Sequence, residues 1–142
     1  MNLRAQLRIG DGLSGHARSI ITSARAALRE GVPAGARLLV DEAKLNVPVD
    51  TGNLRDHIHS EPLEDSDNRQ IYQIAPFYEA SNGYGFDPAY ARRIEYGFIG
   101  VDKLGRHYHH EPQPYMRPAK DIQGPAAVGL IKQIVATAVR GQ

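Results

Sequence analysis

Three segments of this 142-residue chain repeat one apolar spacing, and this repeat constrains the fold more than any other sequence feature. In each segment, apolar residues fall at positions i, i+3, i+4, i+7 and i+11, which forms a stripe along one face of an α-helix. The stripes begin at Ala17, Ala36 and Ala127. The pattern predicts helices near residues 15–30 and 33–46, and a last helix that ends at Arg140.

The boundaries of these helices carry recognisable signals. Ser14 is suited to be the N-cap of the first helix. Gly31 and Pro33 interrupt the pattern, so the first two helices are either separate or one kinked helix. The last helix is expected to begin near Pro118 or Pro125, because proline fits the first turn of a helix.

The region between the helices changes to strand-like patterns. Residues 58–63 are compatible with a strand, 64–68 form a polar turn, and 69–74 alternate polar and apolar residues. Together these predict a β-hairpin. The expected fold is therefore α+β, a small antiparallel β-sheet packed by the N-terminal and C-terminal helices.

Shorter elements are expected beyond the hairpin. Residues 81–87 form a Gly/Asn loop, and 88–95 form a short helix that ends at Gly97. Residues 100–113 are polar and aromatic, which indicates a long loop or a loose hairpin.

The length and composition predict one domain over residues 1–142, with an N-terminal helical segment at 1–32 and a core at 33–142. Cysteine is absent, which excludes disulfides and thiolate metal sites. We find no apolar run of about 20 residues, so no membrane partner is expected. No phosphate-binding glycine motif occurs, and no cofactor is expected.

A histidine cluster is the strongest hint of enzyme chemistry. His107, His109 and His110 offer three imidazoles, which zinc and nickel favour as ligands. No Asp or Glu lies at a helical spacing that would support these ligands. A small metal-dependent enzyme is thus a minor alternative to an exposed, solvated loop.

Charge is distributed unevenly along the chain, although the net charge is only +1. Residues 1–45 have seven Lys/Arg and four Asp/Glu, 46–90 have two and eight, and 91–142 have eight and four. Separated basic and acidic regions can pair between copies of a chain, whereas folding can also mix them. The basic face of Arg18, Arg25 and Arg29 allows two interpretations, a DNA-binding surface or an ordinary solvated helix face.

Three clusters resemble one known family. They are Val-Pro-Val-Asp-Thr-Gly-Asn-Leu-Arg at 47–55, Tyr-Ala-Arg-Arg-Ile-Glu-Tyr-Gly at 90–97 and Gln-Pro-Tyr-Met-Arg-Pro-Ala at 113–119. Their order resembles the tail-completion or neck protein family of long-tailed bacteriophages, the gene-ten-product family of lambdoid phages. The resemblance covers about residues 33–140.

This resemblance implies a structural virion protein without catalytic activity. It implies a ring, commonly sixfold, at the head–tail junction, with genomic DNA passing through the lumen. The implied partners are further copies of the chain and the adjacent neck, connector and tail proteins, and synthesis is expected in the cytoplasm of the bacterial host. A head–tail connector or a tail terminator ring is the alternative within the same class.

The motif residues are expected to have structural roles. They are Asp50, Thr51, Gly52, Leu54, Glu95, Tyr96, Gly97, Pro114, Arg117 and Pro118. Asp50 or Thr51 is expected to cap a short helical turn over 53–58, and Gly52 to adopt an unusual φ. Pro114 and Pro118 are expected to fix the start of the last helix, and Arg117 to form an ion pair with a carboxylate.

A ring also requires complementary surfaces. The candidate interface residues are Arg18, Arg25, Arg29, Glu61, Glu64, Asp65, Leu130, Ile134 and Val135. Ring contacts are heterologous, so the acidic run is expected to face a basic surface of the neighbouring copy. Exposed ion pairs are individually weak, and the apolar face of the last helix is expected to supply most of the affinity.

Overall fold

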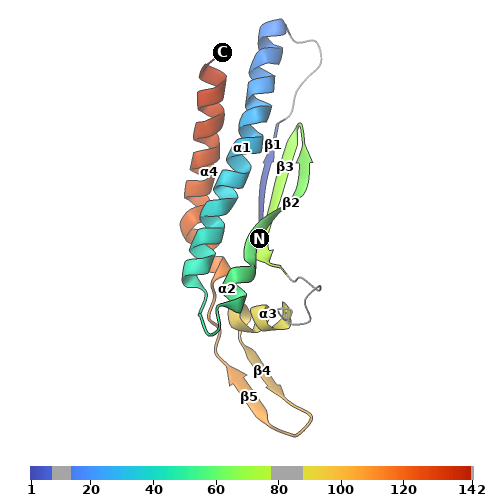
Figure 1. Ribbon diagram of the computed structural model, residues 1–142, viewed down its shortest axis with the longest axis vertical. Helices are drawn as coiled ribbons and strands as arrows, with labels where there is room; N and C mark the ends of the chain where they lie inside the picture. The colour runs from blue at the N-terminus through green and yellow to red at the C-terminus, as the bar shows by residue number, and fades with distance from the viewer. Residues whose placement is uncertain (8–13, 78–87, 142) are drawn as a thin grey trace.

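The computed structural model describes residues 1–7, 14–77 and 88–141, and it is elongated (Figure 1). Helices α1 (Gly15–Asn46) and α4 (Met116–Arg140) lie side by side along the long axis. A three-stranded antiparallel sheet covers the opposite side of α1. The expected α+β fold, with terminal helices packed on a small antiparallel sheet, is confirmed. The predicted loop at 81–87 lies outside the described residues.

Helix α1 answers the question that the sequence left open. It runs without a break through Pro33 and across the expected boundary at residue 32, so the two predicted helices are one. Ser14 is the N-cap, as predicted, and its Oγ accepts a hydrogen bond from the N–H of Ala17 over 3.4 Å. The helix ends at Val47, whose extended backbone is the conformation that Pro48 imposes on the residue before it.

One glycine of α1 lets α4 approach closely. A Cβ on Gly35 would lie 3.1 Å from Ile131 Cδ1 and 3.3 Å from the carbonyl oxygen of Ala127. A Cβ built on Gly31 would lie 3.5 Å from the Cα of Ile131, which is an ordinary contact distance. The missing side chain at Gly35 therefore limits how closely the two long helices pack.

The sheet has the order β1–β3–β2 and is antiparallel throughout. Its strands are β1 (Asn2–Gln6), β2 (Ile58–Ser66) and β3 (Arg69–Pro76). The prediction of a turn over 64–68 was wrong in extent, because β2 continues to Ser66 and the turn is only Asp67–Asn68. A bulge between Pro62 and Glu64 absorbs the register shift.

Strand β1 was not predicted. It pairs with β3 in the register Leu3↔Tyr72, and Leu3 packs against the core cluster. The backbone N–H of Ile74 donates to the carbonyl of Met1 over 2.8 Å. Five residues of modest alternation are too weak a local signal, so pairing with β3 decides their structure.

The core fills the space between α1, the sheet and the lower elements. Its largest fully buried side chains include those of Tyr115, Ile58, Ile74 and Val32. Helices α2 (Asn53–His57) and α3 (Pro88–Tyr96) close the lower end of this core (Figure 1).

A second hairpin projects beyond α3, away from the long helices (Figure 1). It consists of β4 (Phe98–Val101) and β5 (His107–His110). Of the two structures expected for 100–113, the hairpin is the one observed. Helix α4 then begins at Met116, two residues before the earlier of the two starts that the sequence predicted.

Candidate functional site

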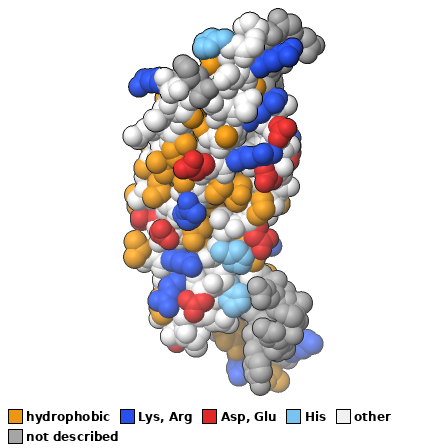
Figure 2. Space-filling model, turned by 45° about the horizontal axis from the view of Figure 1, so that its top comes forward, with side chains coloured by type: hydrophobic (Ala, Val, Ile, Leu, Met, Phe, Trp, Pro, Cys, Tyr) orange, Lys and Arg blue, Asp and Glu red, His pale blue; other side chains and the backbone are white. Residues whose placement is uncertain are grey.

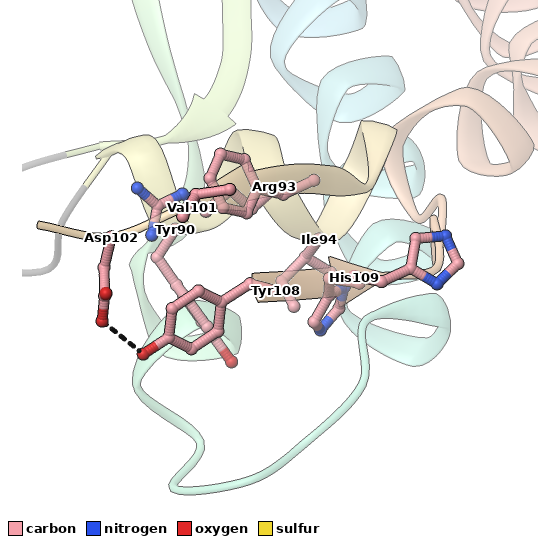
Figure 3. Close-up of a pocket in the computed structure, with 9 residues that line it drawn as sticks. Tyr90, Arg93, Ile94, Val101, Asp102, Tyr108 and His109 are labelled. Carbon is pink, nitrogen blue, oxygen red and sulfur yellow. Dashed lines mark hydrogen bonds between the residues drawn. The ribbon is translucent and has the colours of Figure 1, made fainter. Parts of the chain in front are cut away.

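An open cavity of about 550 Å³ lies between α3 and the β4–β5 hairpin (Figure 3). Its wall is mainly apolar and aromatic, and the lining residues are Tyr90, Arg93, Ile94, Phe98, Val101, Asp102, Tyr108, His109 and His110. The guanidinium carbon of Arg93 lies 4.5 Å from the centre of the Phe98 ring. Asp102 is the only carboxylate among these lining residues, so the described part of the wall offers no carboxylate pair for general acid/base catalysis.

Asp102 organises the tip of the hairpin. Its Oδ1 accepts the backbone N–H groups of Leu104 and Arg106, each over 2.9 Å. Its Oδ2 accepts from Arg106 Nε over 2.6 Å and from the Tyr108 hydroxyl over 3.1 Å, the bond drawn in Figure 3. The N–H of Arg106, and then its guanidinium, hold the pKa of the Asp102 carboxyl below its usual value. The turn is therefore fixed by one ionised side chain.

Glu95 joins two of the motif clusters. Only 7% of this residue is exposed. Its Oε2 accepts the backbone N–H groups of Tyr115 and Met116 over 2.7 and 3.0 Å, and its Oε1 accepts that of Arg117 over 3.1 Å. These groups are the otherwise unpaired donors at the start of α4, so Glu95 caps that helix from a distance.

The structure corrects the expected role of Arg117. Its backbone N–H, and not its guanidinium, contacts the carboxylate of Glu95. The side chain is exposed and forms no ion pair with a described carboxylate. Pro118 lies in the first turn of α4, where its missing N–H costs nothing, while Pro114 is exposed one residue before the N-cap Tyr115.

The cluster at 50–54 forms the corner between α1 and α2. Gly52 has φ of 84°, as expected, and Leu54 is buried in the core. The N-cap of α2 is Gly52 without a side-chain cap, so the prediction of Asp50 or Thr51 as the cap was wrong. Thr51 Oγ1 instead accepts the N–H of Asn53 over 3.4 Å. Asp50 is exposed.

The end of α3 contains the remaining motif residues. Gly97 has φ of 76°, and a Cβ there would lie 2.8 Å from the carbonyl oxygen of His110. Only glycine fits this position without strain, because both the backbone conformation and the nearby strand exclude a side chain. Tyr96, in contrast, is exposed.

The basic face of α1 meets the acidic hairpin of its own chain. Arg29 Nη2 lies 2.6 Å from Asp67 Oδ1, and Arg29 Nε lies 3.6 Å from Asp65 Oδ1. Arg25 Nε donates to Asn68 Oδ1 over 3.0 Å. Arg18 forms no ion pair with a described carboxylate. Folding therefore brings together two regions of opposite charge that the sequence separates.

The other two acidic candidates also have partners within the chain. Glu64 pairs with Arg69 over 3.1 Å, and Glu61 lies 3.0 Å from the Nε2 of His59. All three predicted acidic interface residues thus contact a basic or imidazole group of the same molecule.

The three histidines of the cluster lie on the exposed strand β5. His109 Nε2 is 3.2 Å from a carboxylate oxygen of Glu111. Within residues 1–7, 14–77 and 88–141, no group of three or more His, Asp or Glu is placed to hold a metal ion.

A groove runs between α1 and α4 at the end of the molecule opposite the β4–β5 hairpin. It has a volume of about 580 Å³, and its lining residues are Ser23, Ala26, Ala27, Glu30, Leu130, Gln133, Ile134, Thr137 and Ala138. Figure 2 shows hydrophobic side chains gathered on one face of the molecule, with charged side chains among and around them. Of the three apolar candidates, Leu130 and Ile134 line this groove, whereas Val135 packs against the cluster of Leu28, Val32 and Ile131.

Helix α4 is unusually apolar for its exposure. In the described part of the chain it is the one helix long and apolar enough to cross a membrane, judged by length and composition alone. Only 11% of its most apolar stretch is buried. The core helix of a soluble protein passes the same test, and α4 packs along α1.

Comparison with known proteins identifies the family. A family model described as "Bacteriophage HK97-gp10, putative tail-component" matches residues 13–97. The chain belongs to the HK97-gp10-like family. This confirms the resemblance to the phage tail-completion and neck proteins, and it makes the chain a structural component of the bacteriophage tail.

The match to the HK97-gp10-like family covers α1, α2, strands β2 and β3 and α3, but not strand β1. It ends at Gly97, before the β4–β5 hairpin and α4, and it does not test the third motif cluster. No curated protein and no solved structure matches the chain.

Proposed function

We propose that this protein is a neck or tail-completion subunit that self-assembles into a ring at the head–tail junction of the virion. The family supports a structural role in the tail. The observation that supports self-assembly is α4, whose apolar outer face is left uncovered by its own chain.

The ion pairs within one molecule indicate which kind of contact can hold the proposed ring together. The acidic side chains of the β2–β3 hairpin and the arginines of α1 pair within one molecule. Exposed pairs of this kind contribute about 0–1 kcal/mol each, and rearranging them between copies gains little. Apolar contact is the main source of affinity in the proposed ring.

The proposed ring is sixfold and surrounds the genomic DNA without reading its sequence. Its other partners are the neck, connector and tail proteins above and below it, and the subunit is made in the cytoplasm of the bacterial host. A DNA-reading role for the basic face of α1 has less support, because Arg25 and Arg29 are already engaged by the β2–β3 hairpin.

A nonsense mutation in the gene tests this proposal. Infection of a non-suppressing host is expected to yield DNA-filled heads and free tails that do not join, seen by electron microscopy. The wild-type chain supplied from a plasmid is expected to restore joined particles. Antibody against the chain is expected to label wild-type virions at the head–tail junction.

Three outcomes would contradict the proposal in different ways. Tails of abnormal length would indicate a tail terminator, and label that stays with heads after tails are detached would indicate a connector. Absence of the chain from purified virions would remove the structural role altogether.

A further inference from the structure

The β4–β5 hairpin, including its tip, presents apolar side chains that the described part of its own chain leaves exposed. Leu104 is 79% exposed, and Ile99 and Val101 are 79% and 58% exposed. Val101 and His107, and Ile99 and His109, are cross-strand pairs, so both pairs lie on one face of the hairpin. A two-stranded hairpin is marginally stable by itself. An exposed apolar tip on such an element indicates a binding partner.

The tip is also preorganised. Asp102 accepts four hydrogen bonds within the turn, from the N–H groups of Leu104 and Arg106, the guanidinium of Arg106 and the hydroxyl of Tyr108. Gly105 closes the turn with φ of 76° and an N–H bond of 3.0 Å to the Asp102 carbonyl. A turn held in one conformation loses little entropy on binding, so Leu104 is held ready to enter a pocket.

The groove between α1 and α4 is a suitable acceptor on the same chain. Its apolar wall consists of Ala26, Ala27, Leu130, Ile134 and Ala138. Small side chains on α1 leave room, and the branched side chains of α4 supply apolar surface. A single leucine side chain fits well within a groove of about 580 Å³.

The two surfaces complement each other in charge. Among the described residues that line the groove, Glu30 is the only charged one. Lys103 precedes Leu104 at the exposed tip. Neither residue forms an ion pair with a described residue, so both charges are available to a partner.

The positions of the two surfaces exclude contact within one molecule. The groove lies along residues 23–30 and 130–138, toward the C-terminal end of α4, whereas the hairpin projects from the opposite end of the long axis (Figure 1). The tip of one copy can therefore reach only the groove of another. Two different patches that meet in this way form a heterologous contact, the kind from which rings are built.

We propose that the β4–β5 tip of one copy inserts Leu104 into the α1–α4 groove of a second copy, with Lys103 facing Glu30. This inference rests on the proposed self-assembly and names the two surfaces that carry it. The hairpin and the α4 wall of the groove follow Gly97 and lie outside the matched family region, whereas the α1 wall of the groove lies inside it.

A mixing experiment separates the two surfaces. Leu104→Asp removes the apolar side chain that is proposed to insert. Ala26→Arg fills the groove, at a residue that is exposed. In sedimentation of the full chain, each variant alone is expected to remain monomeric, while an equal mixture forms dimers through the one intact pair of surfaces. Leu45→Asp is the matched control, since Leu45 is equally exposed at 80% on α1, and it is expected to assemble like the wild type.

A charge exchange tests the register. Lys103→Glu and Glu30→Lys are each expected to weaken association by up to about fivefold. The double variant is expected to recover the wild-type affinity. Far-ultraviolet circular dichroism checks that every variant is folded.

The chain contains no cysteine, which allows a direct test in the virion. Oxidised particles carrying both Ala26→Cys and Leu104→Cys are expected to give a ladder of covalent multimers, and particles with either change alone are not. This crosslinking test is informative even if the purified wild-type chain is monomeric, because it is made on assembled particles.

The inference is overturned if Leu104→Asp assembles normally, if the mixture stays monomeric while the wild type assembles, or if the double cysteine virions give no ladder. If antibody locates the chain at the head–tail junction but the double cysteine particles give no ladder, the proposed function stands and the proposed contact is wrong. If the chain is absent from the junction, the proposed function is wrong.

Discussion

The carboxylate of Glu95 accepts a 2.7 Å hydrogen bond from the backbone N–H of Tyr115, across 20 residues of sequence. The β4–β5 hairpin occupies the chain between them, and a second bond of 2.7 Å joins Gln113 N–H to the carbonyl of Ile94. These bonds fasten the base of the hairpin to α3 and to the start of α4. The hairpin therefore projects in a fixed direction, which suits the role proposed for its tip.

Replacing Glu95 by Ala is expected to destabilise the protein by about 2–4 kcal/mol, because three helix N-terminal donors lose their acceptor, one of them buried and two part-buried. Glu95→Gln retains an acceptor and is expected to cost about 1 kcal/mol. Urea unfolding followed by circular dichroism measures both. Asp121→Ala, an exposed position in α4, is the control. A Glu95→Ala protein as stable as this control would disprove the capping role.

Gly97 and Gly105 form a matched pair, since both have φ of 76°. A Cβ on Gly97 would lie 2.8 Å from the carbonyl oxygen of His110, whereas a Cβ on Gly105 would have no neighbour within 4 Å. Gly105→Ala is expected to cost about 1–2 kcal/mol for the left-handed backbone alone. Gly97→Ala is expected to cost clearly more in the same unfolding assay. Equal losses would mean that the α3–β5 contact is not as close as described.

Substitutions at Gly31 and Gly35, the two glycines of α1 that face α4, are expected to change stability in opposite directions. Gly31→Ala has room and gains helix propensity, so it is expected to raise the free energy of unfolding by up to about 1 kcal/mol. Gly35→Val is expected to lower it by about 1–3 kcal/mol, because the added atoms meet Ile131, Leu3 and the Ala127 carbonyl. Thermal unfolding of the two variants compares them directly. A stabilised Gly35→Val protein would contradict the close packing of the helices.

The raised pKa of Tyr115 predicts that the free energy of unfolding falls at alkaline pH. Burial, followed by the negative charge of Glu95, raises the pKa of Tyr115 well above its usual value. In the unfolded chain this hydroxyl ionises near pH 10, whereas in the folded chain it stays protonated. The stability that Tyr115 contributes is therefore complete below about pH 10 and is lost as the pH rises further.

Tyr115→Phe isolates this effect, because other groups titrate alike in both proteins. The difference in free energy of unfolding, wild type minus variant, is expected to stay constant below about pH 10 and to fall by about 1.4 kcal/mol per pH unit above it. Urea titrations at a series of pH values measure the difference. A constant difference throughout would show that Tyr115 ionises normally in the folded protein.

Charge reversal of the acidic run distinguishes pairing within a chain from pairing between chains. Changing Glu61, Glu64 and Asp65 to Lys removes contacts with His59, Arg69 and Arg29 of the same molecule. The expected result is a loss of about 1–3 kcal/mol in stability that shrinks at high salt, with the register of assembly unchanged. Electron microscopy of particles that incorporate the variant checks the register. Mis-registered rings from a fully stable subunit would favour pairing between copies.

The sequence by itself determined the elements whose signals are local. Apolar periodicity predicted α4 and the two segments that form α1, although it left open whether they were one helix. Ser14 marked the start of α1, and the alternation at residues 69–74 predicted β3. The positive φ of Gly52 also followed from its motif, because few residues besides glycine adopt that conformation. The three motif clusters together indicated the family that the comparison then established, and the match covers the first two of them.

The tertiary structure alone decided which distant residues meet. Strand β1 exists because β3 supplies its hydrogen bonds, and its five residues have no strong pattern of their own. Arg29 reaches Asp67 within one molecule because α1 lies along the sheet, whereas the sequence allowed pairing between copies equally well. Glu95 became a helix cap through a contact 20 residues away, which no local spacing encodes. Short-range propensities act within a few residues, and contacts between elements depend on how the whole chain packs.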